Sequence, residues 1–305
     1  MEIKLKAAVC SDKGRRRQNN EDNFCLNGKY MDLKEMDGGT MYACDALPDA
    51  LFAVCDGMGG EEAGEEASLL SARLCAEFLK KGGNLTDRAH VESFLRNGCS
   101  QVYKQAQQKN NRSGSTLALL LAGKAGLVAA NMGDSRIYRL RGGNLSQISE
   151  DHTEMQRLLS LGEIRPEDVK RHPLRHMIRQ YWGMPLEVAP FTPHISEVIP
   201  YEKGDVYLLC SDGLTDMLED EQIAAILSRN ESVEELCRLL VEAALKNGGR
   251  DNVTTLVVRV ERAPEGEKTI ERPRAKKRWP IIALCAATAL IAICALAWFK
   301  LRQLL

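Results

Sequence analysis

The chain has 305 residues, which is enough for one large domain and an additional segment. Apolar residues make up 44% of it and charged residues 27%, with a formal net charge of -1, so a substantial core can form. This balance argues against a disordered acidic protein. It gives no support to nucleic-acid binding, which usually needs a clear basic excess, and we expect no nucleic-acid partner.

Apolar runs and helical spacing predict mixed strands and helices before residue 262. Leu74 and Phe78, for example, lie on one side of a predicted helix. The predicted elements in chain order are a buried strand at 51–55, helices at 63–81 and 88–109, paired strands at 115–122 and 126–132, paired strands at 137–140 and 145–148, a strand at 206–210, helices at 221–229 and 233–247, and a strand at 253–260. Hairpins mixed with long helices favour an α+β fold with antiparallel sheets over a doubly wound parallel fold.

The composition changes abruptly near residue 262. Residues 263–278 are rich in charges and contain two prolines, which predicts a linker after a domain at 1–262. Residues 279–299 contain no charged side chain. At about 1.5 Å per residue they span roughly 30 Å, the thickness of a bilayer's hydrocarbon core. A buried core helix is the alternative, but the stretch has no polar face. We expect a transmembrane helix at 279–299, followed by a short tail at 300–305.

The charges that flank this stretch predict its orientation. After it come only Lys300 and Arg302, whereas the basic residues before it are Arg272, Arg274, Lys276, Lys277 and Arg278. Basic residues favour the cytoplasmic side, so the prediction is a single-pass protein of the cell membrane with residues 1–262 in the cytoplasm. Since only six residues follow the span, we expect insertion after translation.

Cysteine usage indicates a reducing compartment. No two of the ten cysteines have the CxxC spacing of zinc ribbons or thioredoxin-like sites. Several lie in apolar runs, such as Cys55 in the predicted strand at 51–55, and we expect them to be small buried hydrophobes. The N-terminal residues 1–6 have no apolar signal-peptide core.

Aspartates recur at the ends of predicted strands. These are Asp56, Asp134 and Asp212, which follow strands, and Asp251, which precedes one. Converging carboxylates repel one another unless a cation compensates, and oxygen-only ligands select hard cations such as Mg²⁺ or Mn²⁺. A single Asp-Gly pair is usually only a turn. Four aspartates joined to apolar strands favour a divalent-metal site.

Six short motifs occur in order along the chain. They are RQNNED at 17–22, DGMGG at 56–60, SGST at 113–116, GDSR at 133–136, SDGL at 211–214 and GRDNVT at 249–254. Together they resemble the type 2C protein phosphatases, the PPM family that depends on Mg²⁺ or Mn²⁺, in its bacterial form. The resemblance covers residues 3–262. It implies a four-layer α-β-β-α sandwich of two antiparallel sheets flanked by helices, with the metals at one edge.

The resemblance also implies a role for each acidic residue. Asp56 bridges two metal ions, Mn²⁺ or Mg²⁺. One ion is also served by the Gly57 carbonyl and, directly or through water, by Glu21 or Asp22. The other ion is bound by Asp212 and Asp251. Asp134 joins Asp212 at a third, weaker metal position.

The implied reaction is hydrolysis of phosphoserine and phosphothreonine in proteins. Two metals lower the pKa of a bridging water, and the resulting hydroxide attacks phosphorus in line without a phospho-enzyme. Arg17, at a fixed distance from the acidic pair at 21–22, holds the phosphate oxygens, whereas Arg15 and Arg16 are expected to be solvated. The partners implied are phosphoprotein substrates and an opposing bacterial Ser/Thr kinase.

Histidine is absent where some members use it to protonate the leaving group, because this chain has Met58 there. His152 is a candidate substitute, although a local structural hydrogen bond is the alternative we favour. His172 and His176 have the spacing of a metal pair, but Pro173 lies between them and the rest of the site is carboxylate.

Residues 155–185 correspond to the variable flap of the family, which often influences substrate access. The flap ends here in Gln180–Gly183, sequence QYWG, an aromatic departure that we expect to pack the flap down. The alternatives kept open are an inactive phosphoprotein-binding module, a phosphatase of an anti-sigma antagonist, and a membrane scaffold that binds Ca²⁺.

Overall fold

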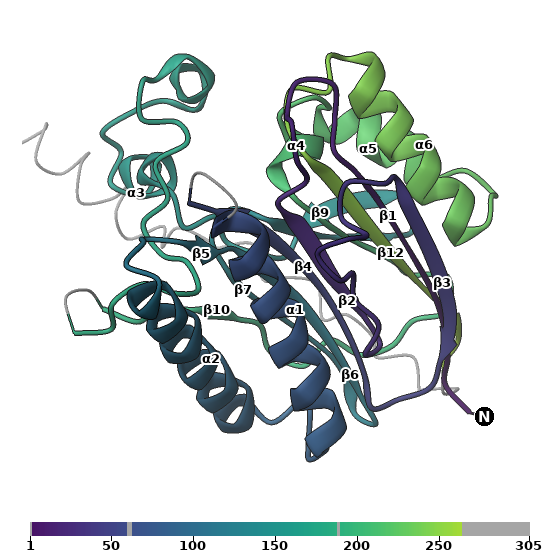
Figure 1. Cartoon of the computed structure of the whole chain (residues 1–305). Coiled ribbons are helices and arrows are strands. Elements are labelled where there is room, and N and C mark those ends of the chain that lie inside the picture. The colour runs from purple at the N-terminus through teal and green to yellow at the C-terminus, as the bar shows by residue number, and fades with distance from the viewer. Residues whose placement is uncertain (1, 60–62, 188–189, 264–305) are drawn as a thin grey trace, which may run out of the picture. The chain divides into compact units, whose positions relative to one another are not determined.

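The computed structural model describes residues 2–59, 63–187 and 190–263 (Figure 1). Contacts divide the chain into two units, Met1–Pro264 and Glu265–Leu305. The predicted membrane helix and tail, and the linker from residue 264 onward, lie outside the described residues. Within the described part, no helix is long and apolar enough to cross a membrane.

Two six-stranded antiparallel sheets form the centre of the first unit. In spatial order, the first sheet contains β3 (Thr40–Ala46), β1 (Lys4–Asp12), β12 (Val253–Arg262), β11 (Val206–Cys210), β8 (Arg136–Arg141) and β9 (Asn144–Gln147). The second contains β10 (His194–Ile195), β7 (Gly126–Met132), β6 (Leu117–Gly123), β4 (Ala50–Met58) and β2 (Asp22–Leu26), while β5 (Gly114–Ser115) pairs with the end of β4.

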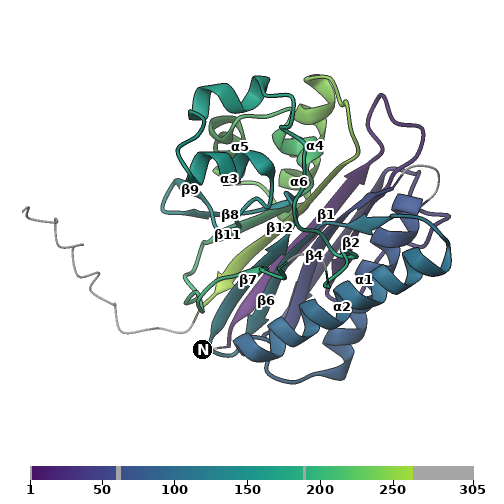
Figure 2. The same ribbon diagram turned by 90° about the vertical axis from the view of Figure 1, so that its left-hand side faces the viewer.

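Helices cover the outer faces of both sheets (Figures 1 and 2). On the second sheet lie α1 (Ala63–Lys81) and α2 (Arg88–Gln108), and on the first lie α4 (Asp212–Thr215), α5 (Asp220–Leu227) and α6 (Val233–Lys246). The flap segment contains α3 (Glu154–Ser160) and the 3₁₀-helix η1 (Pro166–Arg171). The predicted sandwich of two antiparallel sheets flanked by helices is confirmed.

Strand β4 shows how the sequence builds these layers. Phe52 and Val54 point into the core between the sheets, whereas Leu51, Ala53 and Cys55 point into the core beneath α1 and α2. Because successive side chains of a strand face opposite sides, a strand buried on both faces reads as a continuous apolar run. That run ends at Asp56, which places this carboxylate at the rim of the sandwich.

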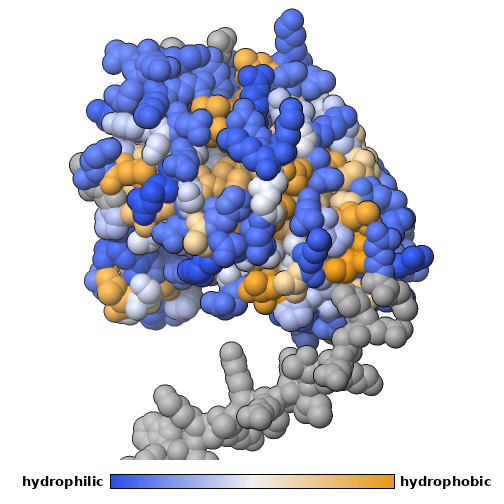
Figure 3. All heavy atoms as spheres, turned by 90° about the horizontal axis from the view of Figure 1, so that it is seen from below, coloured by the Kyte–Doolittle hydropathy of each residue, from blue (hydrophilic) through white to orange (hydrophobic). Residues whose placement is uncertain are grey.

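On the face shown in Figure 3, hydrophilic residues dominate and apolar residues gather only in small groups. Cys25, Cys55 and Cys75 are buried and free, as are Cys99, Cys210 and Cys237. The prediction that cysteines serve as small buried hydrophobes is confirmed for these positions.

Candidate metal centre

Residues from the predicted motifs meet at one edge of the sandwich. They line a hollow of about 630 Å³. Its walls include the predicted site residues Arg17, Glu21, Asp56, Gly57, Asp134, Asp212 and Asp251, together with Met58. Asp22 does not line it. Residues more than two hundred positions apart in the sequence therefore converge, as the strand-end positions of the aspartates predicted.

Asp56 is held rigidly by its backbone. Its N–H donates to Oγ1 of Thr116 at 3.0 Å, and its carbonyl accepts from the N–H of Thr116 at 2.8 Å. The Thr116 hydroxyl in turn lies 2.6 Å from Oγ of Ser135. Burial raises the pKa of Asp56 well above its ordinary value, and repulsion from neighbouring aspartates raises it further. Thr116 and Ser135, which belong to two of the motifs, thus hold the candidate metal ligand Asp56 in place. The sequence did not reveal this supporting role.

Gly57 permits a close approach of three segments. A Cβ atom there would lie 2.1 Å from the carbonyl oxygen of Gly64 and 2.6 Å from that of Glu21. The N–H of Gly57 donates to this Glu21 carbonyl at 3.0 Å. Any side chain would push the loop that carries Glu21 away from β4, so glycine is required by packing here.

Asp134 and Asp212 both line the hollow. Asp212 begins α4 directly after β11, and Asp134 lies in the turn between β7 and β8. The pKa of Asp212 is raised well above its ordinary value by burial and then by repulsion from Asp134. The pKa of Asp134 is raised to about 6, chiefly by burial.

Asn252 joins the segments that carry Glu21 and Asp251. Its Oδ1 accepts from the N–H of Glu21 at 2.9 Å, and its Nδ2 donates to the carbonyls of Lys13 and Asn19 at 2.9 and 2.8 Å. It is almost fully buried. The sequence prediction missed this residue, although it stands inside the GRDNVT motif.

The acidic pair at 21–22 divides between the hollow and the core. Glu21 lines the hollow, and its pKa is raised by burial and by Glu65. Asp22 lies behind it in β2, opposite Asp56 in the strand register. Its Oδ2 accepts from Oγ of Ser211 at 2.7 Å, while its buried Oδ1 has no hydrogen-bond partner among the described residues. Burial raises its pKa to about 7.

The donor set fits hard divalent cations. Among the described residues that line the hollow, the carboxylates are Glu21, Asp56, Asp134, Asp212 and Asp251, whereas the cations are only Arg16 and Arg17. Buried carboxylates whose pKa values are raised by one another lack compensating positive charge. Oxygen-only donors match Mg²⁺ and Mn²⁺. The candidates to hold such ions are Asp56, the Gly57 carbonyl, Asp212, Asp251 and Asp134, which all line the hollow.

Arg16 is exposed, as expected of a solvated residue, and it also borders the hollow. Its exposed side chain lines the same hollow as Arg17. Arg15 instead donates its backbone N–H to the carbonyl of Gly249 at 2.7 Å. The guanidinium of Arg17 pairs with Asp251. Two adjacent arginines therefore border the centre on one side.

The histidines separate into different roles. Nδ1 of His152 accepts from the backbone N–H of Gly133 at 3.2 Å, and the backbone N–H of His152 donates to the Gly133 carbonyl at 2.9 Å. The local structural role of His152 is therefore confirmed. Burial lowers its pKa. His172 accepts from the N–H of Leu174, whereas His176 lies near acidic residues outside the flap. The two do not form the metal pair that their spacing allowed.

The flap ending QYWG packs down, as expected. Trp182 is fully buried, and its Nε1 donates to the carbonyl of Leu95 in α2 at 2.9 Å. The backbones of Trp182 and Ser115 exchange two hydrogen bonds of 2.8 and 2.7 Å. Because Ser115 pairs with Gly57, the end of the flap is connected to the strand that carries Asp56.

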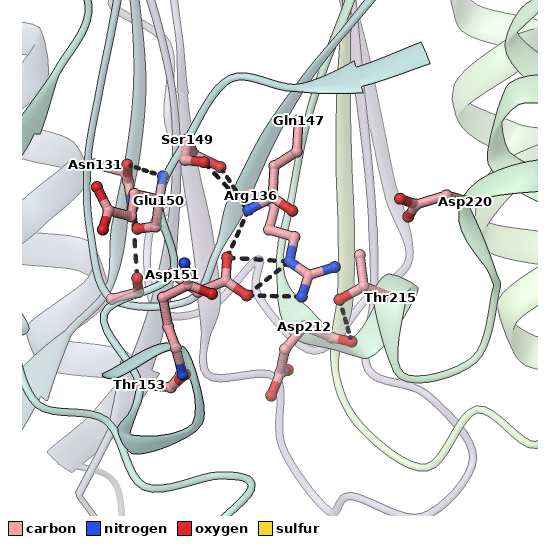
Figure 4. A network of polar contacts seen from close by, with 12 residues as sticks. Asn131, Arg136, Gln147, Ser149, Glu150, Asp151, Thr153, Asp212, Thr215 and Asp220 are labelled. Carbon is pink, nitrogen blue, oxygen red and sulfur yellow. Dashed lines mark hydrogen bonds and ion pairs between the residues drawn. The ribbon is translucent and has the colours of Figure 1, made fainter. Parts of the chain in front are cut away.

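An ion pair joins β8 to the segment that precedes α3 (Figure 4). Nε of Arg136 lies 3.1 and 3.0 Å from the two carboxylate oxygens of Asp151, and Nη2 lies 2.6 Å from Oδ2. Nη1 donates to the hydroxyl of Tyr138, which donates to Asp220. Asp151 thus has its own cation, and it does not depend on a metal for charge compensation.

Comparison with known proteins agrees with this geometry. The family model for protein phosphatase 2C matches residues 41–258. The serine/threonine phosphatase stp of Listeria welshimeri is 34% identical over 262 residues, covering 83% of this chain and 95% of that protein. The crystal structure of the Mycobacterium tuberculosis serine/threonine phosphatase PstP/Ppp has a TM-score of 0.69 at 36% identity, covering 85% of this chain and 100% of that chain.

A further solved structure contains metal. The catalytic domain of the serine/threonine protein phosphatase PstP in complex with two manganese ions has a TM-score of 0.66 at 34% identity, covering 85% of this chain and 99% of that chain. The fold and the site together define a metal-dependent protein phosphatase. The chain belongs to the protein phosphatase 2C family. The predicted enzyme class and cofactors are confirmed.

Proposed function

We propose that this chain hydrolyses phosphoserine and phosphothreonine in proteins, with Mn²⁺ or Mg²⁺ as cofactor. The observation that supports this most directly is the hollow in which five carboxylates and two arginines from separate motifs meet. The relatives named as serine/threonine phosphatases support the choice of substrate class.

Different residues have different roles in this reaction. Asp56, Asp212 and Asp251 would hold divalent cations, and the Gly57 carbonyl and Glu21 would add oxygen donors, directly or through water. Arg17 binds the phosphate oxygens through charge-assisted hydrogen bonds, which favour a bidentate geometry. Bound divalent cations supply Lewis-acid activation of water and compensate the charge of the phosphate. Met58 has no proton to donate, so proton transfer to the leaving group does not depend on this side chain.

The test compares turnover and binding in the full-length chain. A phosphothreonine peptide should be hydrolysed with Mn²⁺, and EDTA should stop this hydrolysis. A phosphotyrosine peptide of the same sequence is the matched control and should react far more slowly. Binding of the phosphothreonine peptide without turnover at saturating Mn²⁺ would favour the inactive binding module instead.

We also propose that residues 279–299 anchor the enzyme in the cell membrane with the phosphatase domain in the cytoplasm. The uncharged stretch of bilayer length and the basic residues before it support this proposal. The full-length chain should remain in the membrane fraction after alkaline carbonate washing, and a chain that ends at residue 262 should be soluble. Release of the full-length chain by carbonate would contradict the anchor.

Such an anchor restricts the enzyme to phosphoproteins near the inner membrane face, among them an opposing Ser/Thr kinase. Phosphopeptides from membranes with and without the chain should reveal these substrates. Accumulation of phosphorylated kinase peptides in its absence is the expected result. Accumulation only on a soluble anti-sigma antagonist would favour the other candidate substrate.

A further inference from the structure

The flap brings a histidine to the acidic side of the metal centre. A ring nitrogen of His176 and carboxylate oxygens of Asp212 and Asp216 all lie within 4.8 Å of one another. Asp212 is a residue of the hollow described above, whereas Asp216 and His176 have no role in that centre. The cluster therefore extends the centre towards the flap.

The two aspartates are fixed by one short helix. Asp212 is the first residue of α4 and Asp216 is its C-cap, with the Asp216 N–H donating to the Asp212 carbonyl at 2.8 Å. Residues four positions apart on a helix lie on the same side, so both carboxylates face the same region.

The backbone of the flap places His176 opposite them. His176 ends a turn at 173–176, and Ile178 forms a β-bridge with Thr153 directly after it. The Glu154 N–H donates to the Met177 carbonyl at 2.9 Å, and the Arg179 N–H donates to the His152 carbonyl at 2.7 Å. The position of His176 is thus tied to the start of the flap.

The three side chains line a second hollow of about 360 Å³, which shares Asp134 and Asp212 with the first. Its charged walls also include Glu219 and Asp220. The cations facing this hollow are Arg136, which is engaged by Asp151, together with Arg175 and Arg250. An ion held in this hollow would lie next to the main centre, because the two hollows share Asp134 and Asp212.

The state of the imidazole suits a ligand. Nε of Arg175 donates to Nε2 of His176 at 2.7 Å, and a nitrogen that accepts a hydrogen bond carries a lone pair. A neutral ring is the form that binds metals. Ligation through Nε2 would replace the hydrogen bond from Arg175.

The distances also suit one ion. Two ligands of one cation lie at most about 4.4 Å apart when each bond is about 2.2 Å long. His176 and Asp216 are exposed, so a small rotation of these two side chains is enough to bring the ligand atoms from 4.8 Å to that distance. We propose that His176 is a nitrogen ligand of a divalent transition-metal ion that Asp212 and Asp216 also bind, so that this ion fastens the flap to the centre.

The proposal has a consequence for metal preference. Imidazole is a common ligand of transition metals, whereas Mg²⁺ prefers oxygen donors and keeps its waters. Mn²⁺ should therefore occupy this position more strongly than Mg²⁺. The inference rests on the proposed metal-dependent function, because it extends the same group of carboxylates.

The test uses pulsed electron paramagnetic resonance of Mn²⁺ bound to the full-length chain in detergent, without an affinity tag. The chain has five histidines, and the ligands assigned to the main centre are all oxygen atoms. A coupling to a directly bound nitrogen should appear as Mn²⁺ saturates the protein, and it should change when ¹⁵N-histidine is incorporated. His176→Ala should abolish it.

The matched control is His172→Asn. His172 lies in the same segment, and an asparagine oxygen can replace its Nδ1 as acceptor for the Leu174 N–H. This variant should keep the nitrogen coupling. A coupling that is absent at saturating Mn²⁺, or that persists in His176→Ala, overturns the proposal.

Metal affinity and flap protection give a second measurement. Loss of partners near a metal typically lowers affinity about 10- to 100-fold, and we expect at least this loss for the weakest Mn²⁺ in His176→Ala and Asp216→Asn. Mn²⁺ should slow tryptic cleavage of the flap in the unmodified chain and in His172→Asn, but not in His176→Ala. If Mn²⁺ binds tightly and the peptide is turned over normally but no nitrogen coupling appears, only the assignment of His176 as a ligand is wrong. Absence of any Mn²⁺ binding would remove the proposed function as well.

Discussion

Nη2 of Arg17 lies 2.7 Å from Oδ2 of Asp251, so the residue expected to bind phosphate is paired with a residue expected to bind metal. The hydrogen bond that Arg17 donates to Asp251 is the largest cause of a raised pKa for the Arg17 guanidinium. An ion that takes Asp251 as a ligand competes with Arg17 for the same carboxylate. On the proposed roles, metal binding would free the guanidinium for the phosphate, so the metal would bind before the substrate.

Arg17→Ala should raise KM for a phosphopeptide and leave Mn²⁺ affinity undiminished. A hydrogen bond to a charged group contributes about 1.5–3 kcal/mol, which corresponds to roughly a 10- to 100-fold loss in kcat/KM. Arg15→Ala is the control, because Arg15 does not line the hollow. Steady-state kinetics with saturating Mn²⁺ measure the effect, and an unchanged KM would remove the phosphate role of Arg17.

Asp56→Asn should reduce turnover by at least about 100-fold, because a ligand central to the ions loses its charge. The fold should persist, since the bonds to Thr116 involve only the backbone of residue 56 and the carboxylates no longer repel one another as strongly. Asp45→Asn, at an exposed surface ion pair with Lys4, is the control. Near-normal turnover of Asp56→Asn at saturating Mn²⁺ would show that the metal assignment is wrong.

Asp22→Asn should stabilise the protein in EDTA, and more so at higher pH. Burial raises the carboxyl pKa of Asp22 from 3.8 to about 7, so the folded protein binds this proton more tightly than the unfolded chain. The raised pKa therefore stabilises the folded protein fully below about pH 4, and this stabilisation is lost as the pH rises to about 7.

The stability difference between Asp22→Asn and the unmodified chain should therefore grow by up to about 4 kcal/mol between pH 4.5 and pH 8. Denaturant unfolding at several pH values measures it, and comparing the two proteins cancels the opposite contribution of His152. A difference that shrinks with rising pH contradicts the raised pKa. Mn²⁺ should raise the unfolding temperature of the unmodified chain more at pH 7.5 than at pH 5.5, because ions bind deprotonated carboxylates.

Trp182→Ala should lower the free energy of unfolding by about 3–5 kcal/mol, the usual cost of removing a large buried aromatic side chain. The indole packs against Phe94 and donates to Leu95. Trp182→Phe keeps most of this packing and should cost about half as much. Urea unfolding distinguishes the variants, and equal stability of Trp182→Ala and the unmodified chain would show that the flap is not anchored there.

Hydrophobic patterns in the sequence predicted the strands and helices whose apolar residues follow a clear local pattern. The run at 51–55 predicted β4, and Asp56 at its end predicted the rim of the sandwich. Apolar runs did not predict β1 and β3, because Lys6 and Asp45 interrupt the apolar patterns of these strands. Both strands are held in place by pairing with each other, and β1 also by pairing with β12, which is a tertiary effect.

Motifs identified the site residues but not the direction of each side chain. RQNNED does not reveal that Asp22 turns into the core towards Ser211, because the pairing of β2 with β4 decides this. Nor does the sequence bring His176 near Asp216, since forty residues separate them and the turn of the flap sets their distance. Three-dimensional contacts supplied what spacing could not.

The close approach at Gly57 has a consequence for protein engineering. Since no side chain fits between the carbonyls of Gly64 and Glu21, a library that varies position 57 should yield misfolded chains rather than new metal preferences. The exposed side of the cluster, at Asp216 and His176, offers room for exchange of ligands. An enzyme retuned for another metal is therefore more accessible through its flap than through its central strand.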